Sequence, residues 1–472
     1  MWNKLNKSMM FCQMMFGLSF YGVLVSLTRF FLEDLNYNEA DTMMIVGAFS
    51  AIGPLFAIAG GFIADKFLGA YRSLSIAFLA FAAGYVLLVL GASATNVPLS
   101  MCQEDFEKGY PINYSVNNVG AFLGQYLFPM IVLVIGFNGG FTISAVMAGA
   151  ALVMLLMFRK GLTGVAAELD QKAVSLKNWV FFALISVAMI ALVFFMFSNM
   201  DIGQNIVYAI GGAAILYFVS LMLKASKAES LKMGTILIVT FLTTCFFVYY
   251  GQMMTSMNMV AINTLKGSLF GFIPLEPEAA MAMNPLWCMV GGPIVAGFFG
   301  MLEKRDVHLS TATKIAMAFV LTAIAFGILT FAVTTVGEDV VIMPEIFLAI
   351  HFFQAIAEVI VGSMVVAFIL SVAPKHIENF SVSLFSVAIA LSGIVGAAFS
   401  TSIAMEKGQE ITQEIVQTVY GDYFQLLTVL AVVMVAIAMA ASVVIRKMLD
   451  AAKESEAQAQ PVEIEAGVEV QS

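Results

Sequence analysis

The chain has 472 residues, of which 61% are hydrophobic and only 11% are charged, and its formal net charge is -9. Water-soluble domains carry about 25% charged residues, so this composition excludes a soluble globular protein. The negative charge does not indicate a particular partner, because much of it lies in loops and in the tail after Asp450. No nucleic-acid partner is expected.

Apolar runs recur from Met9 to Val444. They are about 18 to 25 residues long, and each can cross a hydrocarbon layer of about 30 Å as a helix. Because backbone groups find no water inside lipid, each crossing must be a helix or part of a closed barrel, and runs without alternation exclude the barrel. The predicted fold class is therefore all-α and polytopic. Lys4 and Lys7 precede the first run, but no small-residue cleavage site follows, so we expect a retained first helix.

About thirteen spans are predicted by length and hydrophobicity. They cover residues 9–32, 43–64, 73–93, 113–136, 141–158, 178–198, 205–223, 234–256, 280–302, 315–336, 344–370, 380–404 and 422–445. Lys and Arg gather in alternate short loops, and such loops stay on the cytoplasmic side of a membrane. From Arg159 onward the spans alternate with these charges and end in a cytoplasmic tail, while acidic segments such as 33–41 fall on the opposite side.

In the first part of the chain, the number of predicted spans disagrees with the sidedness that the basic residues predict. Arg72 and the loop before Tyr114 are both expected on the cytoplasmic side, yet only one predicted span separates them. Either the stretch from Ser73 to Gly109 enters the membrane and returns without crossing, or a helix is missing from it.

Five segments carry recognisable motifs. GGFIADKFLGAYR, from Gly60 to Arg72, ends the second span and forms the first cytoplasmic turn. Its glycines allow helices to approach closely, while Asp65 and Arg72 sit at the membrane edge, where they can lock neighbouring helices in one state. The other segments are YGVLVSLTRFFLEDLNYNEAD (21–41), INYSVNNVGAFLG (112–124), FFVYYGQMMTSMN (246–258) with MNPLWCMVGGPIVAG (283–297), and FFQAIAEVIVGS (352–363) with LSVAPK (370–375).

In this order the segments resemble the motifs of the proton-dependent oligopeptide transporter family of the major facilitator superfamily, and the resemblance covers nearly the whole chain. It implies two helical bundles around a central cavity, working by alternating access. Residues 1–160 would form the N-terminal bundle and 233–447 the C-terminal bundle. Residues 161–232 would hold two extra transmembrane helices, and 448–472 a disordered cytoplasmic tail. The implied location is the cell inner (plasma) membrane.

The chain departs from the family in residues that handle charge. The resembled first helix opens with two glutamates and an arginine, which serve proton coupling and carboxylate binding, and here Gln13, Phe16 and Gly17 stand in those places. Asn96 corresponds to a lysine of the family's fourth helix, and Gly251 to a glutamate of its seventh. The sequence therefore leaves proton coupling open.

Glu358 is the main functional candidate on physical grounds alone. A carboxylate in the middle of an apolar span costs about 2.5 to 3.5 kcal/mol to insert, so it is expected to face a wet cavity or a partner. In the resembled family this position meets the amino group of the substrate, and a protonated glutamate can also carry a proton. His351 and Gln354 share its helix face. His351 is either a second proton carrier or an interfacial residue.

The resemblance assigns substrate contact to Tyr21, Asn118, Gln252 and Asn284. Such polar side chains also join helices at about 0.6 kcal/mol each, and the sequence leaves both roles open. Arg29, near the outer end of the first span, is expected to extend toward the lipid headgroups, with a substrate carboxylate as the alternative partner.

The predicted function is a secondary transporter of di- or tripeptides or peptide-like solutes, with any proton coupling through Glu358 and His351. An uncoupled facilitator of another small solute and a non-transporting, sensor-like or degenerate relative are the alternatives. No enzyme and no cofactor are expected, because the sequence holds no convincing metal cluster, nucleophile elbow or phosphate loop. The cysteines lack metal-ligand spacing and are predicted to be free thiols: Cys12, Cys102, Cys245 and Cys288.

Overall fold

The computed structural model describes residues 4–63, 67–68, 70–89, 106–157 and 172–459, which are helical apart from loops and one short hairpin. The first helices are α1 (Lys4–Arg29), the π-helical turn η1 (Phe30–Asp34), α2 (Glu39–Ile63), α3 (Ala70–Val89) and α4 (Phe106–Met157). They are followed by α7 (Leu176–Ser198), α8 (Met200–Lys224), α9 (Lys227–Gly251), α10 (Ser256–Thr264) and the 3₁₀ turn η3 (Pro277–Ala282). The last are α11 (Met283–Glu303), α12 (Thr311–Thr334), α13 (Pro344–Val372), η4 (Lys375–Ile377), α14 (Glu378–Ser400), η5 (Thr401–Ile403), α15 (Gln413–Ile415), η6 (Val416–Tyr420) and α16 (Gly421–Ala459).

Among the described residues, ten helical stretches are long and apolar enough to cross a membrane. The predicted all-α polytopic fold is confirmed. Helix bounds follow the predicted spans closely: the span predicted at 344–370 is α13, and that at 178–198 is α7. Local signals explain several of the starts, since Ser226 and Glu229 form a capping box at α9 and Pro344 occupies the first turn of α13.

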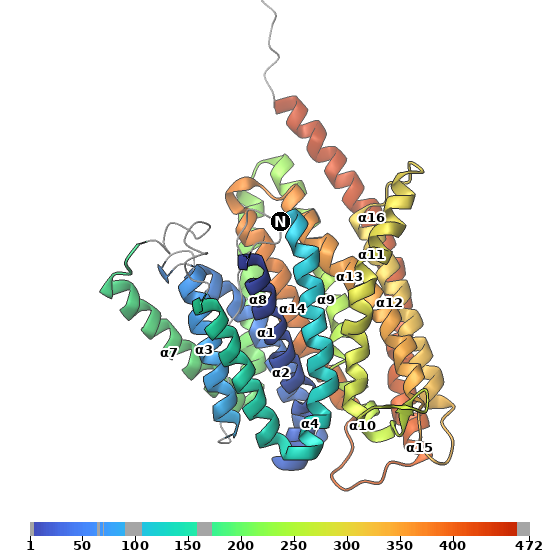
Figure 1. The fold of residues 1–472 in the computed structure, drawn as a ribbon. Coiled ribbons are helices and arrows are strands. Elements are labelled where there is room, and N and C mark those ends of the chain that lie inside the picture. Colours follow the sequence, from blue (N-terminus) through green and yellow to red (C-terminus); the bar gives the residue numbers. More distant parts are fainter. Residues whose placement is uncertain (1–3, 64–66, 69, 90–105, 158–171, 460–472) are drawn as a thin grey trace, which may run out of the picture.

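Helix α4 is a helical hairpin that turns at Gly136. The backbone there has φ +71° and ψ 171°, a conformation open to glycine and strained for other residues. In a straight helix Phe128 and Phe141 would be about 20 Å apart, yet their ring centroids are separated by 6.0 Å. The spans predicted at 113–136 and 141–158 are therefore the two arms of α4, drawn in teal in Figure 1.

The first arm of α4 runs parallel to α1. A Cβ atom at Gly120 would lie 2.3 Å from the carbonyl oxygen of Met14, and one at Gly124 would lie 2.3 Å from that of Leu18. Because the contact positions rise together along both helices, the two helices begin at the same face of the molecule. This direction agrees with the predicted cytoplasmic loop before Tyr114. Residues 90–105, on which the two alternatives for 73–109 depend, lie outside the described ranges.

The helices end at two opposite faces of the molecule, the terminal face and the hairpin face. The terminal face is where α1 begins and α16 ends, and there Lys232 of α9 pairs with Glu456 of α16 at 2.6 Å. The hairpin face is the opposite one (Figure 1), where the antiparallel strands β1 (Ser268–Leu269) and β2 (Ile273–Pro274) follow α10.

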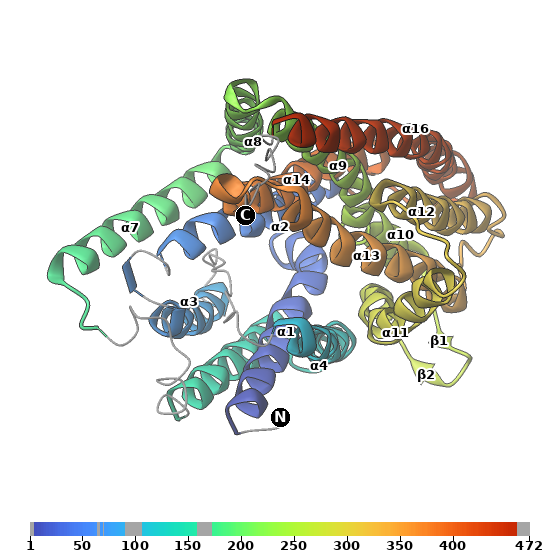
Figure 2. The same ribbon diagram turned by 90° about the horizontal axis from the view of Figure 1, so that it is seen from above.

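Seen from above (Figure 2), α1, α3 and α4 form one group and α9 to α14 with α16 form another, while α7 lies at the periphery. Helix α2 packs against α14 of the second group through small residues, since a Cβ at Gly47 would lie 2.2 Å from that of Ala397. Helix α8 packs on α14 through Gly211 and Leu391. The domain boundaries at 160, 232 and 447 stay predictions.

The prediction that residues 448–472 form a disordered tail is wrong for its first part. Helix α16 continues to Ala459, and residues 460–472 lie outside the described ranges. The segment from Met448 to Ala459 is rich in Ala, Glu, Lys and Gln, which are strong helix formers. Extending an existing helix also needs no new nucleation, so these residues remain helical beyond the apolar part.

Candidate functional site

Glu358 occupies the midpoint of α13, fourteen residues from either end of the helix. Its side chain is half-buried. The exposed residues of α13 form one stripe and are Ala349, Ser363, Ala367, Leu370 and Ser371. At 100° per residue, Glu358 points about 170° away from this stripe. The carboxylate therefore opens into the protein and not toward the lipid.

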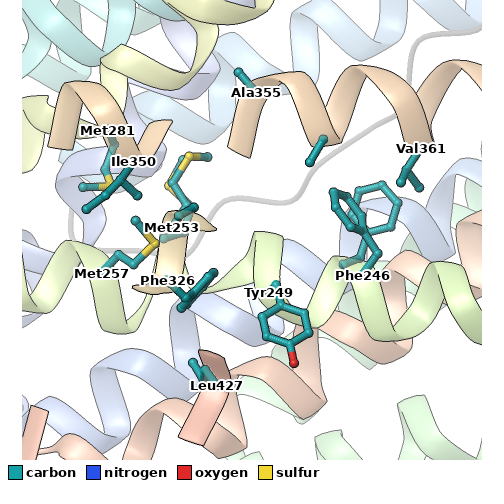
Figure 3. Packing of buried hydrophobic residues seen from close by; sticks show 14 of the residues in the cluster. Phe246, Tyr249, Met253, Met257, Met281, Phe326, Ile350, Ala355, Val361 and Leu427 are labelled. Carbon is teal, nitrogen blue, oxygen red and sulfur yellow. The ribbon is translucent and has the colours of Figure 1, made fainter. Parts of the chain in front are cut away.

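The apolar core beneath α13 fixes this orientation. Figure 3 shows Ile350, Ala355 and Val361 of α13 beside residues of α9, α10 and α12, among them Phe246 and Met257. These side chains are fully or almost fully buried. A core packed to this density leaves little freedom for α13 to rotate, so the position of Glu358 is set by its neighbours.

Three helices bring polar groups to the Glu358 carboxylate. The Cys288 thiol of α11 donates toward its Oε2 atom at 3.3 Å, and the Tyr250 hydroxyl, at the end of α9, hydrogen-bonds to it. The Tyr21 phenol of α1 lies close enough to interact with its charge and is hydrogen-bonded to Asn117 of α4. The predicted residues Tyr21 and Glu358 are thus brought together across the two helix groups.

The predicted polar strip of α13 exists, but most of it is buried. His351 is fully buried, and neither of its ring nitrogens has a hydrogen-bond partner among the described residues. Gln354 is 6% exposed and donates to the Met257 sulfur at 3.3 Å, while its carbonyl oxygen has no partner within the described chain. His351 is therefore a core residue of the second group and not an interfacial one.

Asn118 and Asn284 lie on α4 and α11, one in each helix group. The Asn284 Oδ1 atom lies 3.7 Å from the Cys288 sulfur, so it competes with Glu358 for a single thiol proton. Its Nδ2 atom is buried with no partner among the described atoms. Asn118 is 8% exposed and follows Asn117, the partner of Tyr21. Both asparagines retain predicted substrate roles.

Gln252 is placed differently from the other predicted site residues. Its amide nitrogen donates to the carbonyl oxygens of Val248 and Gly396, at 3.0 and 3.1 Å. Its oxygen accepts from the hydroxyls of Ser256, Ser400 and Tyr423, at 2.6, 2.8 and 2.6 Å. Both amide donors and the acceptor are in use, so in this conformation Gln252 joins α9, α14 and α16 and has no capacity left for a ligand.

Arg29 does not extend to the headgroups, and that expectation is wrong. Its guanidinium contacts Glu278 of η3 at 3.0 Å and Glu33 at 2.9 Å, and the Glu278 side chain is completely buried. Ser26 also donates to Glu278, at 3.4 Å. The Glu278 carboxylate draws the Arg29 guanidinium into the protein, because a buried carboxylate without a cation nearby is strongly destabilising. This pair ties the end of α1 to the beginning of α11.

Further contacts close the hairpin face between the two groups. Asn258 of α10 donates to the Val25 carbonyl and the Thr28 hydroxyl, both at 3.2 Å. Tyr126 of α4 donates to the Pro274 carbonyl at 2.9 Å, and Glu39 of α2 accepts from the backbone of Met405 at 2.9 Å.

Of the two predicted gating residues, Asp65 lies outside the described ranges. Arg72 donates to the carbonyl oxygens of Leu68 and Lys172, at 3.0 and 2.8 Å. It thereby ties the beginning of α3 to the segment before α7. Cys12, Cys245 and Cys288 are free thiols, and Cys102 lies outside the described part of the chain.

Sequence reasoning did not name Tyr250 or Glu278, and it noted Cys288 only as a free thiol. The signal for Glu278 was present, because a carboxylate stood at the edge of one apolar span and Arg29 at the edge of another. Nothing in the sequence indicated that these two edges meet.

A family model described as the POT family matches residues 101–417 of this chain. Dipeptide and tripeptide permease A of Pectobacterium carotovorum is 24% identical over 430 residues, which cover 86% of this chain and 84% of that protein. Dipeptide and tripeptide permease B of Salmonella typhimurium is 23% identical over 415 residues, covering 82% and 84%.

Solved structures share the fold. A bacterial homologue of the human drug peptide transporters PepT1 and PepT2 superposes with a TM-score of 0.80 at 20% identity, over 94% of this chain and 98% of that one. A POT family transporter in complex with 5-aminolevulinic acid gives 0.77 at 17% identity, over 94% and 96%.

Proposed function

The chain belongs to the POT family, and from this premise we propose that it is a secondary transporter of di- or tripeptides or peptide-like solutes that works by alternating access. The observation that supports the proposal most directly is Glu358, a carboxylate at the midpoint of a membrane helix that opens into the protein between the two helix groups. Ionisable groups at this depth are expensive, and they mark binding or ion pathways by default. The relatives named as dipeptide and tripeptide permeases supply the substrate class.

The terminal face is proposed to be cytoplasmic, in the inner membrane, with the C-terminus inside. Helices α8, α11 and α13 end there beside Lys224, Lys304 and Lys375, and basic residues favour the cytoplasmic side. The hairpin face carries acidic residues such as Glu338 and is held shut by the Arg29–Glu278 pair. In this arrangement the site would exchange with the cytoplasm while the outer entrance is closed.

Proton coupling is proposed to run through Glu358, with His351 as the second carrier. Both residues lie on one face of α13, about 10 Å apart along the helix axis. His351 is fully buried here, so this role would require a conformation in which water reaches its ring nitrogens. This arrangement would serve in place of ionisable groups in α1, where Gln13, Phe16 and Gly17 carry none.

The test is uptake of labelled peptides into proteoliposomes, with and without an inward-acid proton gradient. Purified wild-type protein is compared with Glu358→Gln and with Glu303→Gln, a control that removes an exposed carboxylate at the end of α11. We expect accumulation driven by the gradient in the wild type and the control. Uptake by Glu358→Gln should fall at least about tenfold, because one lost ionic contact of this kind exceeds 1.4 kcal/mol.

Other outcomes separate the alternatives. Equilibration that ignores the gradient would replace the symporter with an uncoupled facilitator. Absence of flux for every peptide, in protein shown to be folded, would refute transport of this class.

A further inference from the structure

The hairpin of β1 and β2 presents two aromatic rings that the protein leaves uncovered. Phe270 is 55% exposed and Phe272 is 74% exposed, and their ring centroids are 6.4 Å apart. Met343, which is 61% exposed, follows Ile342, and Ile342 pairs with Leu265 just before the hairpin. Large apolar side chains gathered at one exposed place mark a surface that meets lipid or another protein.

The backbone at the hairpin tip would suit other residues better than phenylalanine. The Phe272 nitrogen donates to the Leu269 carbonyl oxygen at 3.3 Å, and the two residues between them, Phe270 and Gly271, have φ +55° and +76°. Turns of this kind usually hold Asn, Asp or Gly, because a bulky side chain is strained at positive φ. The Glu345 carboxylate accepts from the Phe270 nitrogen and holds this conformation. An exposed ring kept at a strained position points to a contact outside the chain.

The hairpin lies at the edge of the second helix group, on the face where the helices end. It projects past α11 at the edge of the molecule (Figure 2) and belongs to the hairpin face (Figure 1). Its inner side packs on protein, since Leu269 contacts the apolar core and the Pro274 carbonyl oxygen accepts from Tyr126 at 2.9 Å. Lys266, at the base of the hairpin, is exposed. Phenylalanine with a nearby lysine is a combination typical of segments at a lipid interface.

We propose that the hairpin tip docks on the lipid bilayer. The Phe270 and Phe272 rings enter the boundary between headgroups and acyl chains in the leaflet on the side of the hairpin face. Phospholipid is the occupant because α11, past which the hairpin projects, exposes the apolar residues Val290, Ile294 and Phe298 along its length. The hairpin tip continues this lipid-facing surface to the end of the helix.

Docking makes lipid part of the structure that closes the hairpin face. The hairpin joins α10 to η3, and both of these elements contact α1: Asn258 of α10 donates to the Val25 carbonyl oxygen, and Glu278 of η3 pairs with Arg29. A tip held in the bilayer restricts the movement of both elements. The inference needs only a chain inserted in a membrane, so it is independent of the transported solute.

The first experiment is photochemical crosslinking of the full chain in nanodiscs of phosphatidylcholine. Benzoylphenylalanine, which retains the aromatic ring, replaces Phe272, Ile294 or Glu338, one position at a time. After illumination, mass spectrometry measures the lipid attached to each position. Ile294 is the lipid-facing reference on α11, and Glu338 is an exposed position in a loop of the hairpin face.

We expect the lipid adduct at position 272 to match that at 294. It should exceed that at 338 at least about tenfold, because burial of a phenylalanine ring favours the docked state by about this factor or more. A lipid yield at 272 as low as that at 338 would overturn the inference. Crosslinks from 272 to a second copy of the chain in place of lipid would also overturn it, since the patch would then be a subunit interface.

The second experiment tests the effect on the hairpin face by hydrogen–deuterium exchange in the same nanodiscs. Phe272→Ser should speed exchange over residues 256–282. Phe331→Ser is the matched control, because Phe331 is an exposed phenylalanine of α12, outside the hairpin. That variant should leave exchange over 256–282 unchanged. Equal exchange in Phe272→Ser and the wild type would refute a role of lipid in closing this face.

Discussion

Cys288 and Glu358 are 70 residues apart in the chain, and their side chains meet at the centre of the molecule. A thiol is a weak donor, so its main effect is to hold the carboxylate in one orientation. Tyr250 approaches the same carboxylate from α9. Glu358 is therefore positioned by hydrogen bonds from two neighbouring helices of the second group, and this presents it toward Tyr21 of the first group.

Removing the thiol should weaken ligand binding at Glu358. For Cys288→Ala we expect about a fivefold loss in affinity for a dipeptide, since a hydrogen bond from a weak donor contributes about 1 kcal/mol. Cys288→Ser retains a donor and should bind as the wild type does. Titration calorimetry measures both. Cys245→Ala, which removes a thiol from α9, is the matched control. Wild-type affinity in Cys288→Ala would show that the contact has no positioning role.

At the scale of elements, the parallel packing of α1 on the first arm of α4 depends on glycine. The backbones approach closely at Gly120 and Gly124, where a Cβ would be too near the carbonyl oxygens of α1. Close approach of this kind lets two membrane helices gain contact without a hydrophobic force between them. It also holds Tyr21 beside Asn117, so the helix pair contributes to the site.

Gly120→Ala should destabilise this helix pair by about 1–3 kcal/mol, because the added methyl group overpacks the contact and the backbone atoms of α1 must move. Thermal unfolding in detergent would show a lower midpoint. The control is Gly149→Ala on the second arm of α4, where a Cβ meets nothing within 4 Å. That variant should unfold no earlier than the wild type. An equal loss in both would mean that the helix, and not the contact, is sensitive.

At the scale of the whole molecule, the hairpin face is closed by polar contacts between two groups of helices. The Arg29–Glu278 pair includes a completely buried carboxylate, and its two residues differ in their other partners. Arg29 also forms an ion pair with Glu33 at 2.9 Å and lies 3.9 Å from Glu276. Glu278, in contrast, accepts a hydrogen bond from the Ser26 hydroxyl, which carries no charge. The two halves of the pair should therefore respond unequally to substitution.

Arg29→Gln should open the hairpin face more than Glu278→Gln. The first leaves a buried carboxylate without its cation, which costs about 3–5 kcal/mol, while the second leaves Arg29 with a partly exposed partner and costs about 1 kcal/mol. Hydrogen–deuterium exchange over residues 256–282 measures the opening. The double variant should exchange more slowly than Arg29→Gln. Glu338→Gln, at an exposed position on the same face, is the control. Equal exchange in the two single variants would contradict this account.

The sequence by itself determined the all-α membrane fold and the bounds of most helices, and it identified Glu358 as the main functional candidate. These follow from local properties: run length against bilayer thickness, and the cost of a charge in an apolar helix. The tertiary structure decided what each polar residue contacts. Ser400 and Tyr423 reach Gln252 from 148 and 171 residues away, and Glu278 reaches Arg29 from 249. Such pairings depend on how helices pack together in space, and no local pattern in the sequence carries that information.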